Sequence, residues 1–150
     1  PAPLSVINQY APRWLKRARD DMTTAQILLE SERYGPCAFF CQQAAEKALK
    51  SVLYAVGERP WGHSIPSLLD QVVVVLGVDV ESTPVSEVEA LDEHYMRPRY
   101  PDAQPEVAAE YDRATAELAL EHVRTVMAFA EKGIADVGRT PDNTKIPDMG

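Results

Sequence analysis

The sequence lacks the features that mark several classes of protein. It has only seven glycines among 150 residues and no repeating unit, which excludes collagen-like, solenoid and low-complexity chains. The longest apolar stretch, 72–78, is far shorter than the roughly 20 residues of a membrane-spanning helix. Residues 1–3 do not supply a basic segment followed by an apolar one, so no secretion signal is indicated and we expect a cytoplasmic protein.

Familiar catalytic and metal-binding motifs are absent as well. The chain has no glycine-rich phosphate loop, no His-Glu-x-x-His, no Gly-x-Ser-x-Gly and no Cys-x-x-Cys. Cys37 and Cys41 stand at helical spacing, which suits packing in a core better than a disulfide. The histidines at positions 63, 94 and 122 add no metal-ligand spacing. The sequence therefore predicts neither a metal site nor a cofactor.

The composition of the chain is that of an ordinary globular protein with an excess of acidic residues. Hydrophobic residues make up 45% and charged residues 25%, and 23 acidic against 15 basic residues give a net charge of -8. One domain of this length buries roughly 68–70% of its unfolded surface, enough for a core without disulfides. Proteins that grip long nucleic acid usually have a basic face, so we do not expect binding of extended duplex DNA. A single nucleotide, an RNA end or a basic partner protein is compatible with this charge.

Apolar residues recur at helical spacing along most of the chain. A first helix is predicted over 12–31 and a second from residue 36 to a break at Gly57. A third begins after Ser64, a predicted N-cap. The valine run 72–75 favours a strand locally, but no second strand is available to pair with it, so we predict a helix there.

Two further helices complete the predicted fold. A short one is expected from Thr83 to about Met96, and a long one from 102–105 to a C-cap at Gly133. The economical packing of such helices is an all-α, antiparallel up-and-down bundle of four to five helices. The expected divisions of the chain are an N-terminal segment, 1–11, a helical bundle, 12–133, and a flexible C-terminal tail, 134–150.

One group of polar residues lies along the second predicted helix. Its members are Gln42, Gln43, Glu46, Lys47 and Lys50. Glu46 precedes Lys50 by one helical turn, the favourable order for an ion pair worth about 0.2–0.5 kcal/mol, so a solvated face is the simplest interpretation. The alternative is that Lys47 and Lys50 offer ammonium donors to an anion.

A second polar group precedes the last predicted helix, in a junction stiffened by two prolines. It contains Tyr95, Arg97, Arg99 and Tyr100. Arginine forks bind phosphate oxygens and a tyrosine ring stacks on a base, so this junction suits a phosphate or a nucleotide. Asp102 and later acids of the stretch would repel a phosphate, and pairing of the arginines with nearby acids explains the cluster equally well.

His63 stands next to the predicted N-cap Ser64. An unperturbed imidazole has a pKa of about 6.5, which suits it to general acid–base chemistry when a partner is at hand. The simpler interpretation is that His63 orders its loop by hydrogen bonds. His122 falls within the last predicted helix, and no role is assigned to it.

These pieces together resemble a HEPN domain, a family of small helical bundles. The resemblance runs from about Trp14 to Lys132. It is carried chiefly by 41–50, Cys-Gln-Gln-Ala-Ala-Glu-Lys-Ala-Leu-Lys, and by 99–102, Arg-Tyr-Pro-Asp. It implies an all-α bundle that usually forms homodimers. It also implies relatives that include RNA-cleaving toxins, nucleotide-binding modules and partners of a minimal nucleotidyltransferase.

The chain departs from the pattern of the ribonucleases in that family, in which four to six residues separate an arginine from a following histidine. Here only three residues separate Arg59 from His63, and neither Arg97 nor Arg99 is followed by a histidine until His122. The histidine that would handle the 2′-hydroxyl proton is therefore missing from its expected place. We lean towards a protein that is not an enzyme.

The resemblance and the residues together predict a non-catalytic or weakly active HEPN domain in a toxin–antitoxin-like system. It would bind a nucleotide or an RNA end, a minimal nucleotidyltransferase partner, or both, and form a homodimer without contacting a membrane. One alternative is a metal-independent ribonuclease toxin with a rearranged site, using His63 or His94 as base. Another is a purely structural dimeric scaffold. The residues predicted to bind the nucleotide are Lys47, Lys50, His63, Tyr95, Arg97, Arg99, Tyr100 and Asp102.

Overall fold

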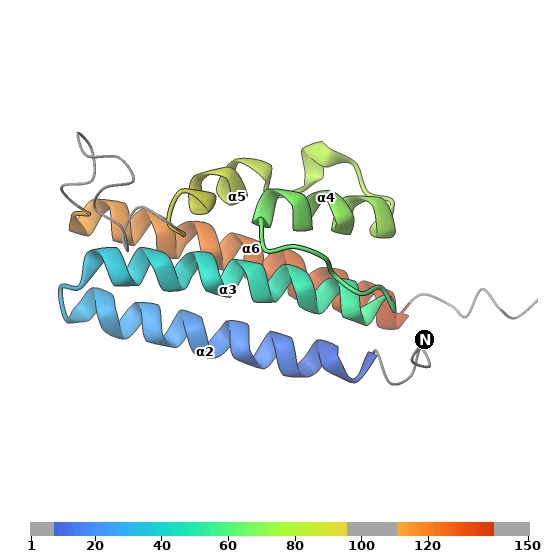
Figure 1. Cartoon of the computed structure of the whole chain (residues 1–150). Coiled ribbons are helices and arrows are strands. Elements are labelled where there is room, and N and C mark those ends of the chain that lie inside the picture. Colours follow the sequence, from blue (N-terminus) through green and yellow to red (C-terminus); the bar gives the residue numbers. More distant parts are fainter. Residues whose placement is uncertain (1–7, 96–110, 140–150) are drawn as a thin grey trace, which may run out of the picture.

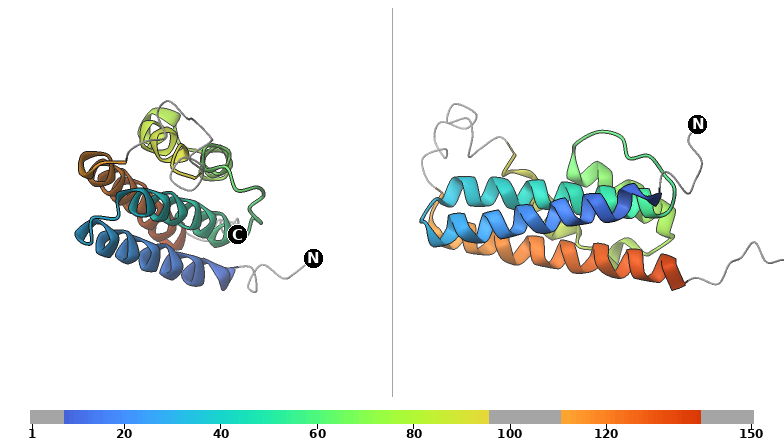
Figure 2. Two further views of the ribbon diagram at one scale, coloured as in Figure 1. Left: turned by 60° about the vertical axis from the view of Figure 1, so that its left-hand side comes forward. Right: turned by 90° about the horizontal axis from the view of Figure 1, so that it is seen from below.

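A computed structural model describes residues 8–95 and 111–139 of the chain. Within these ranges the protein consists of helices and contains no strand, which confirms the all-α prediction. Three long helices run side by side, and two short ones lie along one side of them (Figures 1 and 2). The elements are α2 (Tyr10–Glu30), α3 (Tyr34–Ala55), α4 (Ile65–Leu76), the 3-10 turn η1 (Val80–Ser82), α5 (Val85–Asp92) and α6 (Arg113–Arg139).

Helix α3 is the centre of the fold. It packs against α2, against α6 and against the short helices α4 and α5 (Figure 2). Small residues let neighbouring helices approach closely, and those in the middle of α3, between Cys37 and Ser51, are completely buried. They include Cys37, Ala38, Cys41, Ala45 and Ala48. Both cysteines are free and lie in the core, as their spacing predicted.

Helix α4 begins where the sequence indicates. Ser64 is its N-cap, and the Ser64 side chain accepts a hydrogen bond of 3.4 Å from the backbone N–H of Ser67. Gly77 ends the helix in the left-handed conformation, with a φ of 63°, which glycine adopts without steric cost. The valine run 72–75 is helical. Helical spacing places Val72 in the core, where it is buried.

Helix α6 differs from the prediction at both ends. It begins at Arg113, and the carboxylate of Asp112 accepts hydrogen bonds of 2.8 Å and 2.7 Å from the backbone N–H and the hydroxyl of Thr115. The expected start at 102–105 is therefore wrong as a start of this helix, since residue 112 is its N-cap and is not helical. At the other end the helix continues through Gly133 to Arg139, so Gly133 is no C-cap and residues 134–139 of the expected tail are helical.

The segment between α4 and the end of α5 matches the expected link and short helix. The link contains η1, and α5 carries the buried residues Val88 and Leu91 into the core. Helix α5 ends at Asp92 and residues 93–95 form turns, so the helix is shorter than the expected one, which ends near Met96. No helix within 8–95 or 111–139 is both long enough and apolar enough to cross a membrane.

Candidate functional site

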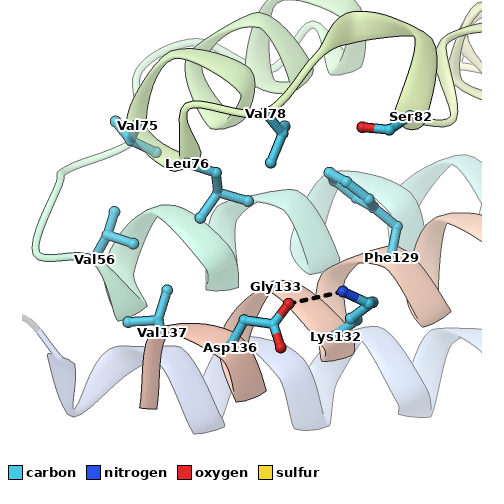
Figure 3. Close-up of a pocket in the computed structure, with 10 residues that line it drawn as sticks. All are labelled: Val56, Val75, Leu76, Val78, Ser82, Phe129, Lys132, Gly133, Asp136 and Val137. Carbon is cyan, nitrogen blue, oxygen red and sulfur yellow. Dashed lines mark hydrogen bonds and ion pairs between the residues drawn. The ribbon is translucent and has the colours of Figure 1, made fainter. Parts of the chain in front are cut away.

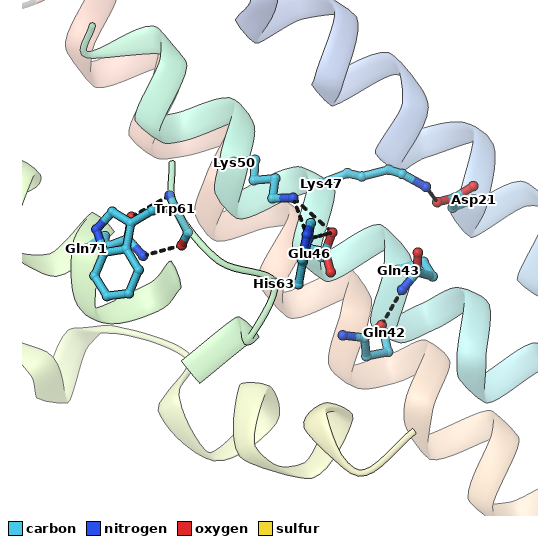
Figure 4. Close-up of polar contacts among 9 residues, drawn as sticks. All are labelled: Asp21, Gln42, Gln43, Glu46, Lys47, Lys50, Trp61, His63 and Gln71. Atoms are coloured by element: carbon cyan, nitrogen blue, oxygen red, sulfur yellow. Dashed lines mark hydrogen bonds and ion pairs between the residues drawn. The ribbon is translucent and has the colours of Figure 1, made fainter. Parts of the chain in front are cut away.

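A buried ion pair on α3 lies behind the exposed side chain of His63. The Nζ of Lys50 lies 3.1 Å from Oε2 of Glu46 and 3.2 Å from Nδ1 of His63 (Figure 4). The side chains of Lys50 and Glu46 are 8% and 9% exposed, whereas that of His63 is 78% exposed. Lys50 Nζ also lies 5.2 Å from the centre of the Trp14 ring, within the range of a cation–π interaction. One lysine thus joins α2, α3 and the loop before α4.

The interpretation of this polar face as solvated is wrong for Glu46 and Lys50. Helices on several sides of α3, together with the loop that carries His63, leave little of its surface facing water. Lys47 lies one turn away from Lys50 and pairs with Asp21 of α2, as Figure 4 shows. The two lysines therefore do not form a common pair of donors.

A cleft of about 310 Å³ lies in front of this ion pair. Its lining comes from α3, from the start of α4 and from the end of α5, and consists of Gln42, His63, Ser64, Asp92 and Tyr95. We call it the His63 cleft. The N-terminus of α4 contributes to it: Pro66 has no N–H and the Ser67 N–H is donated to the Ser64 side chain, so the helix start favours negative charge there mainly through its dipole.

The contact with Lys50 decides which tautomer neutral His63 adopts. An ammonium group only donates hydrogen bonds, so Nδ1 of His63 must accept at this contact. The neutral imidazole then carries its proton on Nε2, where it is a hydrogen-bond donor. When the ring is protonated, Nδ1 becomes a donor, and Oε2 of Glu46 is 3.5 Å away to receive it.

Gln42 adds a second donor to the cleft. Its side chain is 1% exposed, and its Oε1 accepts a hydrogen bond of 2.7 Å from Nε2 of Gln43. The Nε2 of Gln42 points away from Gln43 in Figure 4 and makes no hydrogen bond with another described residue. A buried amide nitrogen of this kind stabilises a ligand that brings an acceptor, because an unpaired buried donor is costly.

Asp92 is the acidic member of the cleft. Partial burial of the carboxyl and the neighbouring charge of Glu93 raise the pKa of Asp92. The cleft thus has donors on the α3 and α4 side and a carboxyl group on the α5 side. That division suits a ligand with a phosphate at one end and amino or ring N–H groups at the other.

The predicted nucleotide-binding residues separate into three sets. His63 and Tyr95 line the His63 cleft, and Lys50 lies behind it against His63. Lys47 lines a different groove, on α2 and α3. Four predicted residues lie outside the described residues: Arg97, Arg99, Tyr100 and Asp102.

Two lining residues were not predicted from the sequence to belong to a site. Gln42 belonged to a face interpreted as solvated, and Asp92 was one acid among many in an acidic stretch. His94, which entered the ribonuclease alternative, is 7% exposed and its Nδ1 lies 2.9 Å from the hydroxyl of Tyr111. It is packed into the structure and does not line the cleft.

A larger cavity lies between α4 and the C-terminal parts of α3 and α6. It has a volume of about 500 Å³ and is lined mostly by valines, Leu76 and Phe129 (Figure 3). Its charged residues, Lys132 and Asp136, are 2.8 Å apart in an ion pair. The cavity offers no acid–base group comparable with His63, and no cluster of three metal-ligating side chains occurs anywhere in the part of the chain that the structure describes.

Comparison with known proteins identifies the family. The model of the HEPN domain matches residues 11–133, which span the helices and the His63 cleft. The chain belongs to the HEPN family. A relative named "Putative toxin MJ1304", from Methanocaldococcus jannaschii, is 29% identical over 99 residues. That alignment covers 63% of this HEPN chain and 65% of the relative, a little under two thirds of the relative's length.

Solved structures show the same HEPN fold. A protein from Thermus thermophilus is 38% identical, with a TM-score of 0.75 over 83% of this chain and 98% of that one. An archaeal HEPN homologue is 25% identical, with a TM-score of 0.67 over 83% and 97%. A HEPN domain protein from Thermotoga maritima is 25% identical, with a TM-score of 0.65 over 82% and 98%.

Proposed function

We propose that this HEPN domain is a toxin-like module that binds a nucleotide or the end of an RNA in the His63 cleft without cleaving it. The donors of the cleft are the Nε2 proton of His63 and the Nε2 amide of Gln42, and the dipole of α4 adds to the attraction of an anion. They would hold a phosphate, while Asp92 and Tyr95 would contact the base. The name of the Methanocaldococcus relative supports the toxin-like role.

The observation that carries the proposal is the contact between Lys50 and His63. General base catalysis of RNA cleavage needs an imidazole nitrogen with a free lone pair beside the 2′-hydroxyl. In neutral His63 the lone pair of Nδ1 is taken by the Lys50 ammonium, and Nε2 carries the proton. The imidazole is therefore arranged to donate to an anion and not to accept a proton.

The assembly of this domain belongs to the same proposal. We propose that it forms a homodimer and that its cognate partner is a minimal nucleotidyltransferase, as in a toxin–antitoxin-like pair. The net charge of -8 favours a partner with a basic contact face. Copurification of the chain with the product of a neighbouring nucleotidyltransferase gene tests the second interaction.

Calorimetric titration of the purified protein tests the ligand. A nucleoside monophosphate should bind saturably, and the matching nucleoside without phosphate should bind far more weakly. His63→Ala should weaken the binding of the monophosphate roughly tenfold, because one charge-assisted donor is lost. His122→Ala is the matched control, since His122 does not line the cleft. A folded protein that binds no nucleotide contradicts the proposal.

An RNA cleavage assay separates binding from the ribonuclease alternative. We expect the protein to leave RNA intact. Cleavage by the wild type that is abolished in His63→Ala would establish a ribonuclease with a rearranged site. Equal cleavage by the wild type and by a His63→Ala, His94→Ala double variant would assign the activity to a contaminant.

A further inference from the structure

A second groove, of about 380 Å³, lies between α2 and α3. Its lining consists of Arg13, Trp14, Arg17, Asp20, Asp21 and Lys47. We call it the α2–α3 groove. Of its residues, only Lys47 was predicted from the sequence to bind a ligand.

The acids of the α2–α3 groove are already neutralised by lysines. Asp21 pairs with Lys47, and Asp20 accepts a hydrogen bond of 3.2 Å from Nζ of Lys16. Arg13 and Arg17 make no ion pair with another described residue, and Cζ of Arg13 lies 6.0 Å from the centre of the Tyr10 ring. The groove therefore carries two uncompensated positive charges on a protein whose net charge is -8.

The placement of these arginines does not serve the stability of α2. Acidic side chains stabilise the start of a helix, because the first N–H groups and the dipole favour negative charge there. The first turn of α2 contains no acidic residue and instead carries Arg13, with Arg17 one turn further on. Arg13 and Arg17 therefore serve to attract an anion to the groove.

A short path of contacts connects the α2–α3 groove to the His63 cleft. Trp14 lines the groove, and Lys50 lies over its ring at 5.2 Å from the centre. The same Lys50 Nζ lies 3.2 Å from Nδ1 of His63, which lines the cleft. Lys47, which lines the groove, and Lys50, which lies behind the cleft, are separated by about 4.5 Å of rise along α3, so the groove and the cleft lie at neighbouring turns of one helix.

We infer that the α2–α3 groove binds the phosphodiester backbone of a single-stranded RNA whose end lies in the His63 cleft. Arg13 and Arg17 would contact phosphates upstream or downstream of the bound end, since arginine forks match phosphate oxygens. This inference rests on the proposed function for the end itself. On this inference, residues of α2 make the protein bind an RNA strand more tightly than a mononucleotide.

Fluorescence anisotropy with a labelled RNA of about eight nucleotides, within the usual site size of single-strand binders, tests the inference. The Arg13→Gln, Arg17→Gln variant should bind this RNA roughly tenfold more weakly than the wild type does. Calorimetry should show unchanged affinity for a mononucleotide. Both arginines are exposed, so the variant should keep the wild-type helical circular dichroism and unfolding temperature.

The matched control is Arg19→Gln, Arg113→Gln, which removes the same charge elsewhere. Arg19 pairs with Glu131 and Arg113 with Glu117, and neither lines the groove. Equal weakening by the two double variants would overturn the inference, because net charge would then explain the effect. Unchanged RNA binding by the Arg13→Gln, Arg17→Gln variant would overturn it as well.

Two further outcomes separate this inference from the function on which it rests. A wild type that binds the RNA through Arg13 and Arg17 but binds no mononucleotide would refute the proposed function and leave the groove as an RNA site. A groove that binds a polyglutamate peptide through the same arginines and binds no RNA would refute the inference, since its ligand would then be an acidic protein segment.

Discussion

At the scale of single residues, the stability of the protein depends most clearly on the buried ion pair of Lys50 and Glu46. Both side chains are more than nine-tenths buried, and each satisfies the charge of the other. Lys50→Met should destabilise the protein by about 3–5 kcal/mol, because it leaves a carboxylate buried without its partner. Urea unfolding followed by circular dichroism measures this change.

A double variant distinguishes the loss of a partner from the loss of packing. Glu46→Leu combined with Lys50→Met removes both charges and fills similar space, so it should recover most of the lost stability. If the double variant is as unstable as Lys50→Met alone, the cation–π and hydrogen-bond contacts of Lys50 stabilise the fold, and the ion pair does not decide the effect.

Asp92 makes the stability of the folded protein increase as the pH falls. A carboxyl whose pKa is higher in the folded state binds more protons when folded, so stability falls as pH rises from its ordinary pKa through the raised one. Asp92→Asn should therefore be more stable than the wild type above that interval and equal to it below. The gain should be small, because the carboxyl is partly exposed. Thermal unfolding across the acid range measures it.

Asp112 supplies a control of opposite sign for that experiment. Hydrogen bonds from the backbone and hydroxyl of Thr115 lower the pKa of Asp112. Its stabilising effect is therefore present above its ordinary pKa and lost as pH falls through the lowered value. Asp112→Ala should lower the unfolding temperature at neutral pH and change it less in acid. Destabilisation by Asp92→Asn would contradict the assignment for Asp92, and stabilisation by Asp112→Ala the one for Asp112.

At the scale of helices, Gly133 decides how α6 ends. A glycine that caps a helix takes a positive φ, at which alanine is strained. Gly133 instead lies inside α6 and is not among the described residues with positive φ. A Cβ added there would meet Leu76 Cδ1 at 3.4 Å, a contact that a flexible methyl group accommodates.

Gly133→Ala should therefore stabilise the protein by about 0.5–1 kcal/mol, since alanine is the better helix former. Gly77→Ala is the control and should destabilise it, because Gly77 has a φ of 63° at a true helix end. Denaturant unfolding of the two variants gives the signs. Destabilisation by Gly133→Ala would mean that α6 ends at this residue in solution.

The helices could be predicted from the sequence as far as local pattern decides them. Spacing of apolar residues identified α2 and α3, and Ser64 marked the start of α4. The start of α6 was missed because it depends on one side-chain cap, Asp112 on Thr115. Its end was missed because a glycine packed under Leu76 looks like a cap in the sequence alone.

The site could be predicted only in part, because local pattern does not reveal which faces of a helix are covered. His63 and Tyr95 were expected to bind a ligand and line one cleft, whereas Glu46 was expected in solvent and is buried. Helix α3 contacts several other helices, so its polar residues face partners and not water. Arg13 and Arg17 look like ordinary surface charge until the lysine partners of the nearby acids are known.

At the scale of the whole molecule, two electrostatic effects of opposite sign act on a bound RNA. The net charge of -8 repels a polyanion, and added salt screens that repulsion. Arg13 and Arg17 attract it locally, and each phosphate they neutralise releases counterions, so added salt weakens that attraction. The salt dependence of RNA affinity reports the difference between the two effects.

The Arg13→Gln, Arg17→Gln variant loses only the local attraction. For single strands the slope of log K against log salt is about -0.7 for each neutralised phosphate, so the variant's slope should be less negative by about 1.4. Arg19→Gln, Arg113→Gln should keep the wild-type slope, because those arginines pair with glutamates outside the groove. Anisotropy titrations at several salt concentrations measure all three slopes. Equal slopes for the three proteins would show that RNA is held by the His63 cleft alone.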